Sequence, residues 1–190
     1  MTFLTDFADQ AVILPIAFAV GVALFAQGWR RGAAAWALVV IVTFAAMLAL
    51  KLVFIACSAS LGTTGIRTPS GHVAAAAVVA GGARSSAAAM VLPLAALAAF
   101  IIGVSRLSLG VHSPAEVLIG AGVGLAGALA LPWHAGPAPK GLDARRVAVI
   151  AVAVVVIFHG MHLPAEAHIR STAWRFDSVL AVCQSSDVRL

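Results

Sequence analysis

The sequence predicts an all-α fold: a single membrane domain (residues 1–190) built as a polytopic transmembrane bundle of about six helices. Of the 190 residues, 62% are hydrophobic and only 10% are charged, and the mean hydropathy is +1.06. This composition lies far outside that of soluble domains. The apolar runs approach the roughly 20 residues that a helix needs to cross a bilayer, whereas a membrane barrel would show short segments of alternating polarity. We therefore expect an integral membrane protein.

Short polar segments separate the apolar runs and set the bounds of the expected spans. The third run is the shortest, because its apolar core extends only from Val73 to Gly82. Small residues dominate the runs, which predicts close helix packing, and Gly120 and Gly124 form the GxxxG pattern of such an interface. The expected spans are residues 11–28, 34–57, 71–83, 87–104, 114–131 and 147–163. Residues 164–190 are expected to form an amphipathic helix on the outer surface, with a frayed tail as the alternative.

Basic residues are scattered between the apolar runs rather than gathered on one polar face. The formal net charge of +5 therefore does not predict binding to nucleic acid. Lysine and arginine in short loops mark the cytoplasmic side, and here they fall in alternate loops. These residues are Arg30, Arg31, Arg84, Lys140, Arg145 and Arg146. The remaining loops then face outward, and the alanine-rich composition favours a bacterial inner (cytoplasmic) membrane.

A first polar motif, Thr68 to His72, stands at the outer start of the third expected span. Thr68 can cap a helix whose first position is Pro69, which leaves the amides of Ser70, Gly71 and His72 at a positive helix end. Such an end binds anions, and glycine lets an oxyanion approach the backbone. His72 is placed to donate a proton to a leaving oxygen. The alternative is an ordinary capped helix with a solvated histidine.

A second polar motif follows the fourth expected span. Arg106 offers a planar fork that suits phosphate oxygens, and His112 can act as a nucleophile if another group holds its ring in the right tautomer. Glu116 lies one helical turn after His112, so its carboxylate can accept the proton of the far ring nitrogen. The alternative for Glu116 is a capping box with Ser113, and we leave both roles open.

The two motifs resemble the second and third signature motifs of the type 2 phosphatidic acid phosphatase superfamily. The matching residues are Pro69-Ser70-Gly71-His72, and Ser105-Arg106 with five residues before His112. The similarity covers Lys51 to about Gly127. It implies a six-helix membrane fold and hydrolysis or transfer of phosphate from a lipid phosphate or pyrophosphate. The family's reaction passes through a phosphohistidine and needs neither metal nor another cofactor.

The resemblance also implies roles for individual residues. His112 would be the nucleophile and His72 the general acid, while Arg106 with Ser70 and Gly71 would bind the phosphate. The expected partners are then a lipid phosphate substrate and the surrounding membrane lipids, with no nucleic acid. Neither the headgroup nor the oligomeric state follows from the sequence.

The chain departs from the family pattern at two places. The family's first motif is a lysine followed, after six residues, by arginine and proline, whereas Lys51 is followed at that spacing by Ser58 and Ala59. Arg67 is our hypothesis for the replacement of that arginine. Lys51 is expected to bind phosphate, and the alternative is that its stem snorkels to the surface. The second departure is Glu116, which stands where the family carries aspartate.

Two other classes of function compete with an enzyme. A non-catalytic protein that binds lipid phosphate, or serves as an assembly partner, is favoured by the altered first motif. A transporter or channel is disfavoured, because the charges gather at one face and no polar ladder runs through the spans. A dinucleotide site at Gly122 to Gly127 is rejected, since no strand precedes this GxGxxG pattern.

Cysteine and the remaining histidines give weaker signals. Cys57 and Cys183 are both expected on the outer, oxidising side, where a disulfide can form, but two unpaired thiols are the favoured reading. His159, His162 and His168 lie close in sequence without a convincing further ligand. We therefore expect no metal site.

Overall fold

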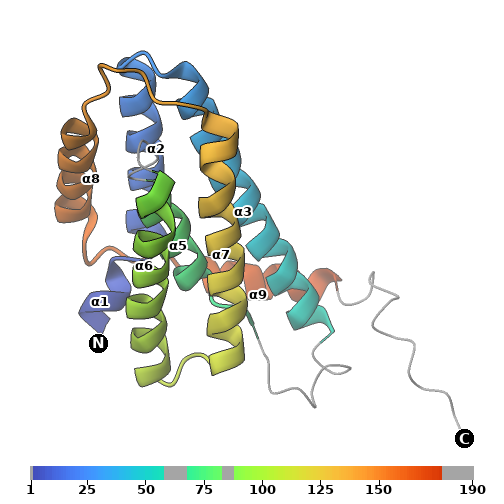
Figure 1. Cartoon of the computed structure of the whole chain (residues 1–190). Coiled ribbons are helices and arrows are strands. Elements are labelled where there is room, and N and C mark those ends of the chain that lie inside the picture. The colour runs from blue at the N-terminus through green and yellow to red at the C-terminus, as the bar shows by residue number, and fades with distance from the viewer. Residues whose placement is uncertain (1, 58–67, 83–87, 177–190) are drawn as a thin grey trace, which may run out of the picture.

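The computed structural model describes residues 2–57, 68–82 and 88–176, and this part of the chain is all-helical (Figure 1). The prediction of an all-α fold is confirmed. The helices are α1 (Thr2–Asp6), α2 (Gln10–Ala26), α3 (Arg30–Ala56), α5 (Gly71–Gly82), α6 (Ala88–Ser108), α7 (Pro114–Ala135), α8 (Ala144–Phe158) and α9 (Ala165–Phe176).

Three helices are long and apolar enough to cross a membrane, namely α3, α6 from Val91 onward, and α7. These three fit an integral membrane protein. Helix α2 and most of α5 are apolar but shorter. With 12 residues, α5 is only about 18 Å long at 1.5 Å per residue, against a hydrocarbon core of about 30 Å. Six full crossings therefore remain a prediction.

The helices run alternately up and down, so the bundle has two distinct ends. The α6–α7 end, which is the lower end in Figure 1, also holds the end of α3 and the connection from α8 to α9. The α2–α3 end holds the turn before Arg30 and the connection from α7 to α8, with Lys140. The two polar motifs thus lie at the end opposite to Arg30, Arg31, Lys140, Arg145 and Arg146.

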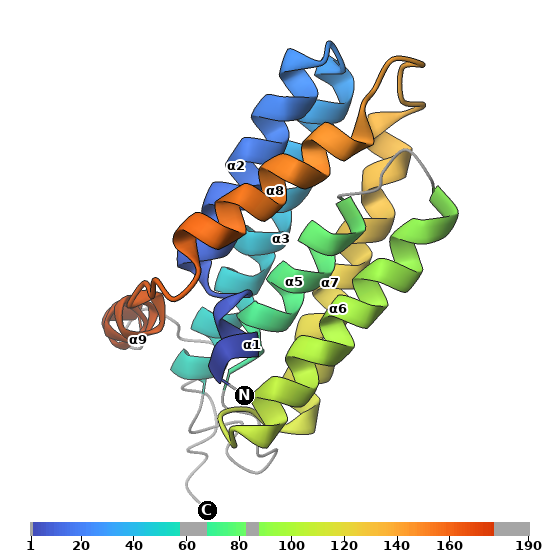
Figure 2. The ribbon, with the colours of Figure 1, turned by 90° about the vertical axis from the view of Figure 1, so that its left-hand side faces the viewer.

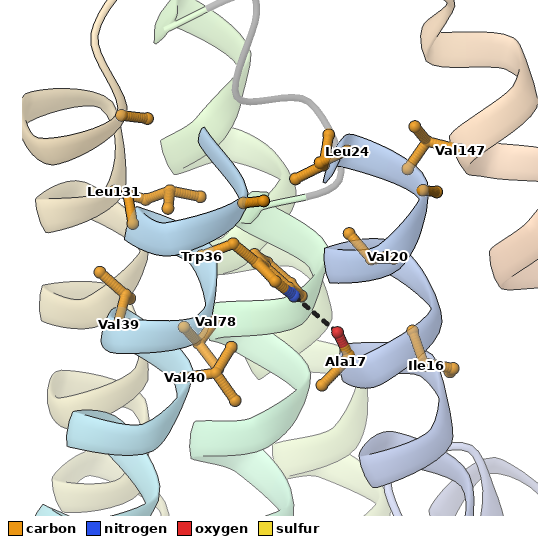
Figure 3. Close-up of a cluster of buried hydrophobic side chains, with 14 of the residues drawn as sticks. Ile16, Ala17, Val20, Leu24, Trp36, Val39, Val40, Val78, Leu131 and Val147 are labelled. Carbon is orange, nitrogen blue, oxygen red and sulfur yellow. Dashed lines mark hydrogen bonds between the residues drawn. The ribbon is translucent and has the colours of Figure 1, made fainter. Parts of the chain in front are cut away.

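A cluster of buried side chains joins α2, α3 and α7 near the α2–α3 end (Figure 3). One of its two tryptophans is Trp36 on α3, which is 1% exposed. The indole Nε1–H donates a hydrogen bond of 2.7 Å to the carbonyl oxygen of Ala17 on α2. Because a bilayer offers no water to a buried N–H group, this bond fixes α3 against α2 at the cluster.

Helix α5 is the innermost helix of the bundle and packs against α3, α6 and α7. Glycines on α7 allow the close approach that the GxxxG pattern predicts. A Cβ at Gly124 would lie 2.5 Å from the carbonyl oxygen of Ala74, and one at Gly120 would overlap the carbonyl oxygen of Ser70. Side chains at either position would push the two helices apart, so the start of α5 is held directly against α7.

Helix α9 lies across the bundle near the α6–α7 end and packs on α3; it is seen from the side in Figure 1 and end-on in Figure 2. It lies within residues 164–190, where a helix is expected. The position of this helix on the outer membrane surface stays a prediction, and residues 177–190 lie outside the described residues. Cys57, which follows α3, is disulfide-bonded. The expectation of two unpaired thiols is therefore wrong. The chain's other cysteine, Cys183, lies outside the described residues.

Candidate active site

The first polar motif forms the start of α5, but the helix begins later than the sequence suggests. Helix α5 starts at Gly71, and the carbonyl oxygen of Ser70 accepts a bond of 3.3 Å from the amide of Ala74. Ser70 is therefore the capping residue, which corrects the expectation that Thr68 caps the helix. The amides of Gly71 and His72 lie in the first turn, where their own helix supplies no carbonyl partner.

The amide of Ser70 is not part of this helix end. It donates a hydrogen bond of 3.0 Å to the main-chain oxygen of Glu116 on α7, which corrects its expected role in anion binding. The Ser70 side chain remains suited to that role. Its hydroxyl is completely buried, and among the described residues it has no hydrogen-bond partner. A bound phosphate oxygen would satisfy it, because buried polar groups are nearly always paired.

Glu116, 4% exposed, joins the two motifs. Its Oε2 lies 3.0 Å from Nδ1 of His112 and accepts a 2.9 Å bond from the amide of Ser113. Its Oε1 accepts a 2.8 Å bond from the amide of Thr68. The capping box is also complete, since the Ser113 hydroxyl accepts from the amide of Glu116. The two roles left open for Glu116, capping and histidine orientation, therefore occur together.

His112 lies in the connection between α6 and α7, and its side chain is 5% exposed. Because the Glu116 carboxylate can only accept, Nδ1 carries the proton and Nε2 of the neutral ring keeps its lone pair. Burial lowers the pKa of His112 from the ordinary 6.5; the charges of Arg106 and Lys51 act in the same direction, against the hydrogen bond to Glu116. At neutral pH the imidazole is therefore neutral, as a nucleophile must be.

Two cations lie near His112. Lys51 is 3% exposed, and a Cβ at Gly71 would lie 3.5 Å from its Nζ. Its ammonium group therefore faces the start of α5, whereas snorkelling would carry it to the surface. Arg106 lies in the last turn of α6 and is half-buried. Together they supply positive charge around the start of α5 and the His112 ring.

Two predicted site residues remain, His72 and Arg67. His72 is the second residue of α5 and is half-buried. Its role as a general acid remains a prediction. Arg67 lies outside the described residues, so its replacement of the first-motif arginine remains a hypothesis.

One part of the site has no counterpart in the sequence-based prediction. A cavity of about 380 Å³ lies beside Lys51, between α3, α5 and α9, and we call it the α3–α5 groove. Met47, Leu48, Lys51, Gly71, Ala74 and Ile169 are among the residues that line it. Leu48 is 45% exposed, so the groove opens on the outer surface of the bundle. No sequence pattern indicates this groove, because it forms where residues 120 positions apart meet.

Near one end of this apolar helical bundle lie two cations, a helix start and a neutral histidine, and such groups suit the binding of a phosphate anion. The family model of the PAP2 superfamily matches residues 54–137, which hold both motifs. We therefore assign this segment to the PAP2 superfamily, and the resemblance seen in the sequence is confirmed. Members of this superfamily are phosphatases that act on phosphate esters, which supports an enzyme.

The match begins three residues after Lys51, in keeping with the altered first motif. Comparisons of the chain with curated proteins and with solved structures gave no match.

Proposed function

We propose that this protein removes or transfers the phosphate group of a lipid phosphate or pyrophosphate at the outer face of the membrane, through a phosphohistidine and without a metal ion. The observation that carries the proposal is the buried His112–Glu116 pair, with Lys51 and Arg106 close enough to lower the pKa of the His112 ring. Phosphoryl transfer depends chiefly on positioning and on charge stabilisation, and this arrangement supplies both.

In the first step, Nε2 of His112 attacks the phosphorus in line with the leaving oxygen. The N–P bond forms as the P–O bond breaks, and His72 gives a proton to the departing alcohol or phosphate. The proton on Nδ1 stays on His112, where the Glu116 carboxylate 3.0 Å away stabilises the positive ring. Lys51, Arg106, the first-turn amides of α5 and the Ser70 hydroxyl bind the equatorial oxygens.

In the second step, water or an acceptor lipid attacks the phosphohistidine. His72, now neutral, takes the proton from the attacking oxygen, and the N–P bond breaks to restore the neutral His112 ring. Atoms and charges then balance over the cycle, with water or the acceptor lipid as the second substrate.

Two observations support a lipid substrate and an outward site. The α3–α5 groove is mostly apolar and reaches Lys51, so a hydrocarbon chain can lie in it while the phosphate lies at the cations. Cys57 directly follows α3, at the end of the helix that carries Lys51, and is disulfide-bonded. Disulfides persist in oxidising compartments outside the cytoplasm. The basic loops at the opposite end agree with this orientation.

The test is phosphate release by the purified protein from a panel of lipid phosphates, with a chelator present. We expect release by the wild type, loss of all detectable release in His112→Ala, and a rate about 10²- to 10⁴-fold lower in His72→Ala. His134→Ala is the matched control, because that imidazole is exposed at the α2–α3 end. Undiminished release by His112→Ala would refute the phosphohistidine route.

The second candidate is a membrane protein that binds lipid phosphate without turning it over. The altered first motif favours it, because Ser58 and Ala59 stand in place of the family's arginine and proline. Saturable binding of lipid phosphate with no phosphate release, from any member of the panel, would support this candidate over the enzyme.

A further inference from the structure

The α3–α5 groove is closed on one side by α9, a helix outside the segment that the family model matches. Ala165 and Ile169, one helical turn apart, lie on the same face of α9 and line the groove. His168 also lines it, and Nδ1 of that ring donates a 2.8 Å bond to the carbonyl oxygen of Pro164. The α9 wall is therefore built mainly from small and apolar groups.

The groove is large enough for the hydrocarbon chain of a lipid, and the charge of Lys51 suits the lipid's phosphate group. Its volume of about 380 Å³ lies within the range of ligand pockets, roughly 300–1,000 Å³. Lys51 marks one end, and Thr43 on the same helix also lines the groove. They are eight positions apart along α3, or about 12 Å. The groove thus extends along α3 from Lys51, with Ala165, His168 and Ile169 of α9 as one of its walls.

The connection before α9 is anchored to the N-terminal segment by what we call the clasp, made by Asp6, Asp9, His159 and His162. Nε2 of His162 lies 3.0 Å from Oδ1 of Asp6, and the amide of Leu163 donates a 3.3 Å bond to Oδ1 of Asp9. The His159 ring packs against Phe3 and Phe7, with its centroid 4.6 Å from each. These contacts fix the point from which α9 starts.

We propose that α9 is a specificity-determining element, with Ile169 setting how much hydrocarbon the α3–α5 groove accepts next to the phosphate and the clasp holding the helix in place. This inference rests on the proposed function, because it assigns the groove to the chain of that reaction's substrate. Helix α9 is then the part of the molecule that selects the hydrocarbon chain of the substrate. Ile169 contacts the chain and takes no part in the chemistry at His112.

The test compares a substrate that has a chain with one that has none, using the full-length protein in nanodiscs. In Ile169→Trp we expect KM for dodecyl phosphate to rise about tenfold, while kcat/KM for phenyl phosphate stays within about twofold of wild type. Ile169→Ala should instead favour branched-chain phosphates over dodecyl phosphate. Val156→Trp is the matched control, since Val156 is 73% exposed on α8 and does not line the groove.

The outcomes separate this inference from the proposed function. Equal changes for dodecyl and phenyl phosphate in Ile169→Trp, or no change for either, would overturn the role of α9. If the wild type releases no phosphate at all, binding of dodecylphosphonate replaces turnover as the readout. Weaker binding in Ile169→Trp but not in Val156→Trp would then support α9 as the chain-contacting wall while the enzyme proposal fails, and unchanged binding in both variants would refute it.

A second variant pair tests the clasp without touching the groove. Asp6→Ala and His162→Ala remove the same contact from its two sides, so both should raise KM for dodecyl phosphate and leave phenyl phosphate unaffected. Because Asp6 and His162 lie outside the catalytic residues, a loss of turnover on phenyl phosphate would show that the contact supports the fold rather than the position of α9.

Discussion

The charged side chains at the two ends of the bundle differ in burial and in what they contact. At the α6–α7 end, Lys51 and Glu116 are 3% and 4% exposed and lie against backbone and side chains of other elements. At the α2–α3 end, the Arg146 side chain is 75% exposed and pairs with Asp143 only three residues away. Buried charge is costly beside a bilayer. The costly arrangement therefore occurs at the end with the candidate site, while the charged side chains at the other end stay exposed.

Among the tests of this comparison, the largest loss of phosphate release is expected when Glu116 is substituted. Glu116→Gln keeps the shape but not the charge, so the ring of His112 loses its charged acceptor and the stabilisation of its positive form. We expect phosphate release to fall about 10²- to 10⁴-fold. Glu116→Asp keeps the charge but is one methylene shorter and cannot reach both Thr68 and His112. Its rate should lie between those of wild type and Glu116→Gln, and a wild-type rate in Glu116→Gln would contradict the role.

A smaller effect is expected in the pH dependence of the same reaction. Protonation of His112 removes the nucleophile, so kcat/KM falls as pH falls through the pKa of His112, which burial places below 6.5. Glu116→Gln removes the negative charge of Glu116, which raises this pKa. Its acid limb should therefore lie at lower pH than that of wild type. Both proteins are measured with one substrate, so that titration of the substrate phosphate affects them equally. An acid limb at higher pH in the variant would be inconsistent with this assignment.

The smallest effects are expected at the α2–α3 end. Arg146→Ala should change the free energy of unfolding by less than about 1 kcal/mol, because exposed ion pairs contribute little. Asp143→Ala should cost more, about 1 kcal/mol, since the carboxylate also accepts bonds from the amides of Arg145 and Arg146 at the start of α8. Thermal unfolding and phosphate release are measured together. Loss of phosphate release in Arg146→Ala would show that exposed charges at the α2–α3 end also matter for activity, contrary to the difference between the two ends.

The fold and part of the site could be predicted from sequence because their signals are local. Apolar runs, positive loops and two short motifs gave the all-α class and the gathering of both motifs at one end. The start of α5 was misplaced because Thr68 and Ser70 are both good capping residues, and only tertiary contacts decide between them. The bond from the Thr68 amide to Glu116 spans 48 positions and exists only because Gly120 lets α7 approach Ser70. Neither this bond nor the α9 wall has a local signature.

The contact between Gly120 and Ser70 leaves no room for a side chain between α5 and α7 at this point. Any side chain added at Gly120 would separate the helices and pull His112 away from the α5 helix end, so sliding one helix past the other offers no route to new substrates. We expect changes in substrate preference to arise instead at the periphery, where α9 lines the groove. Exchanging that single helix between related proteins should thus transfer chain preference while leaving the reaction itself untouched.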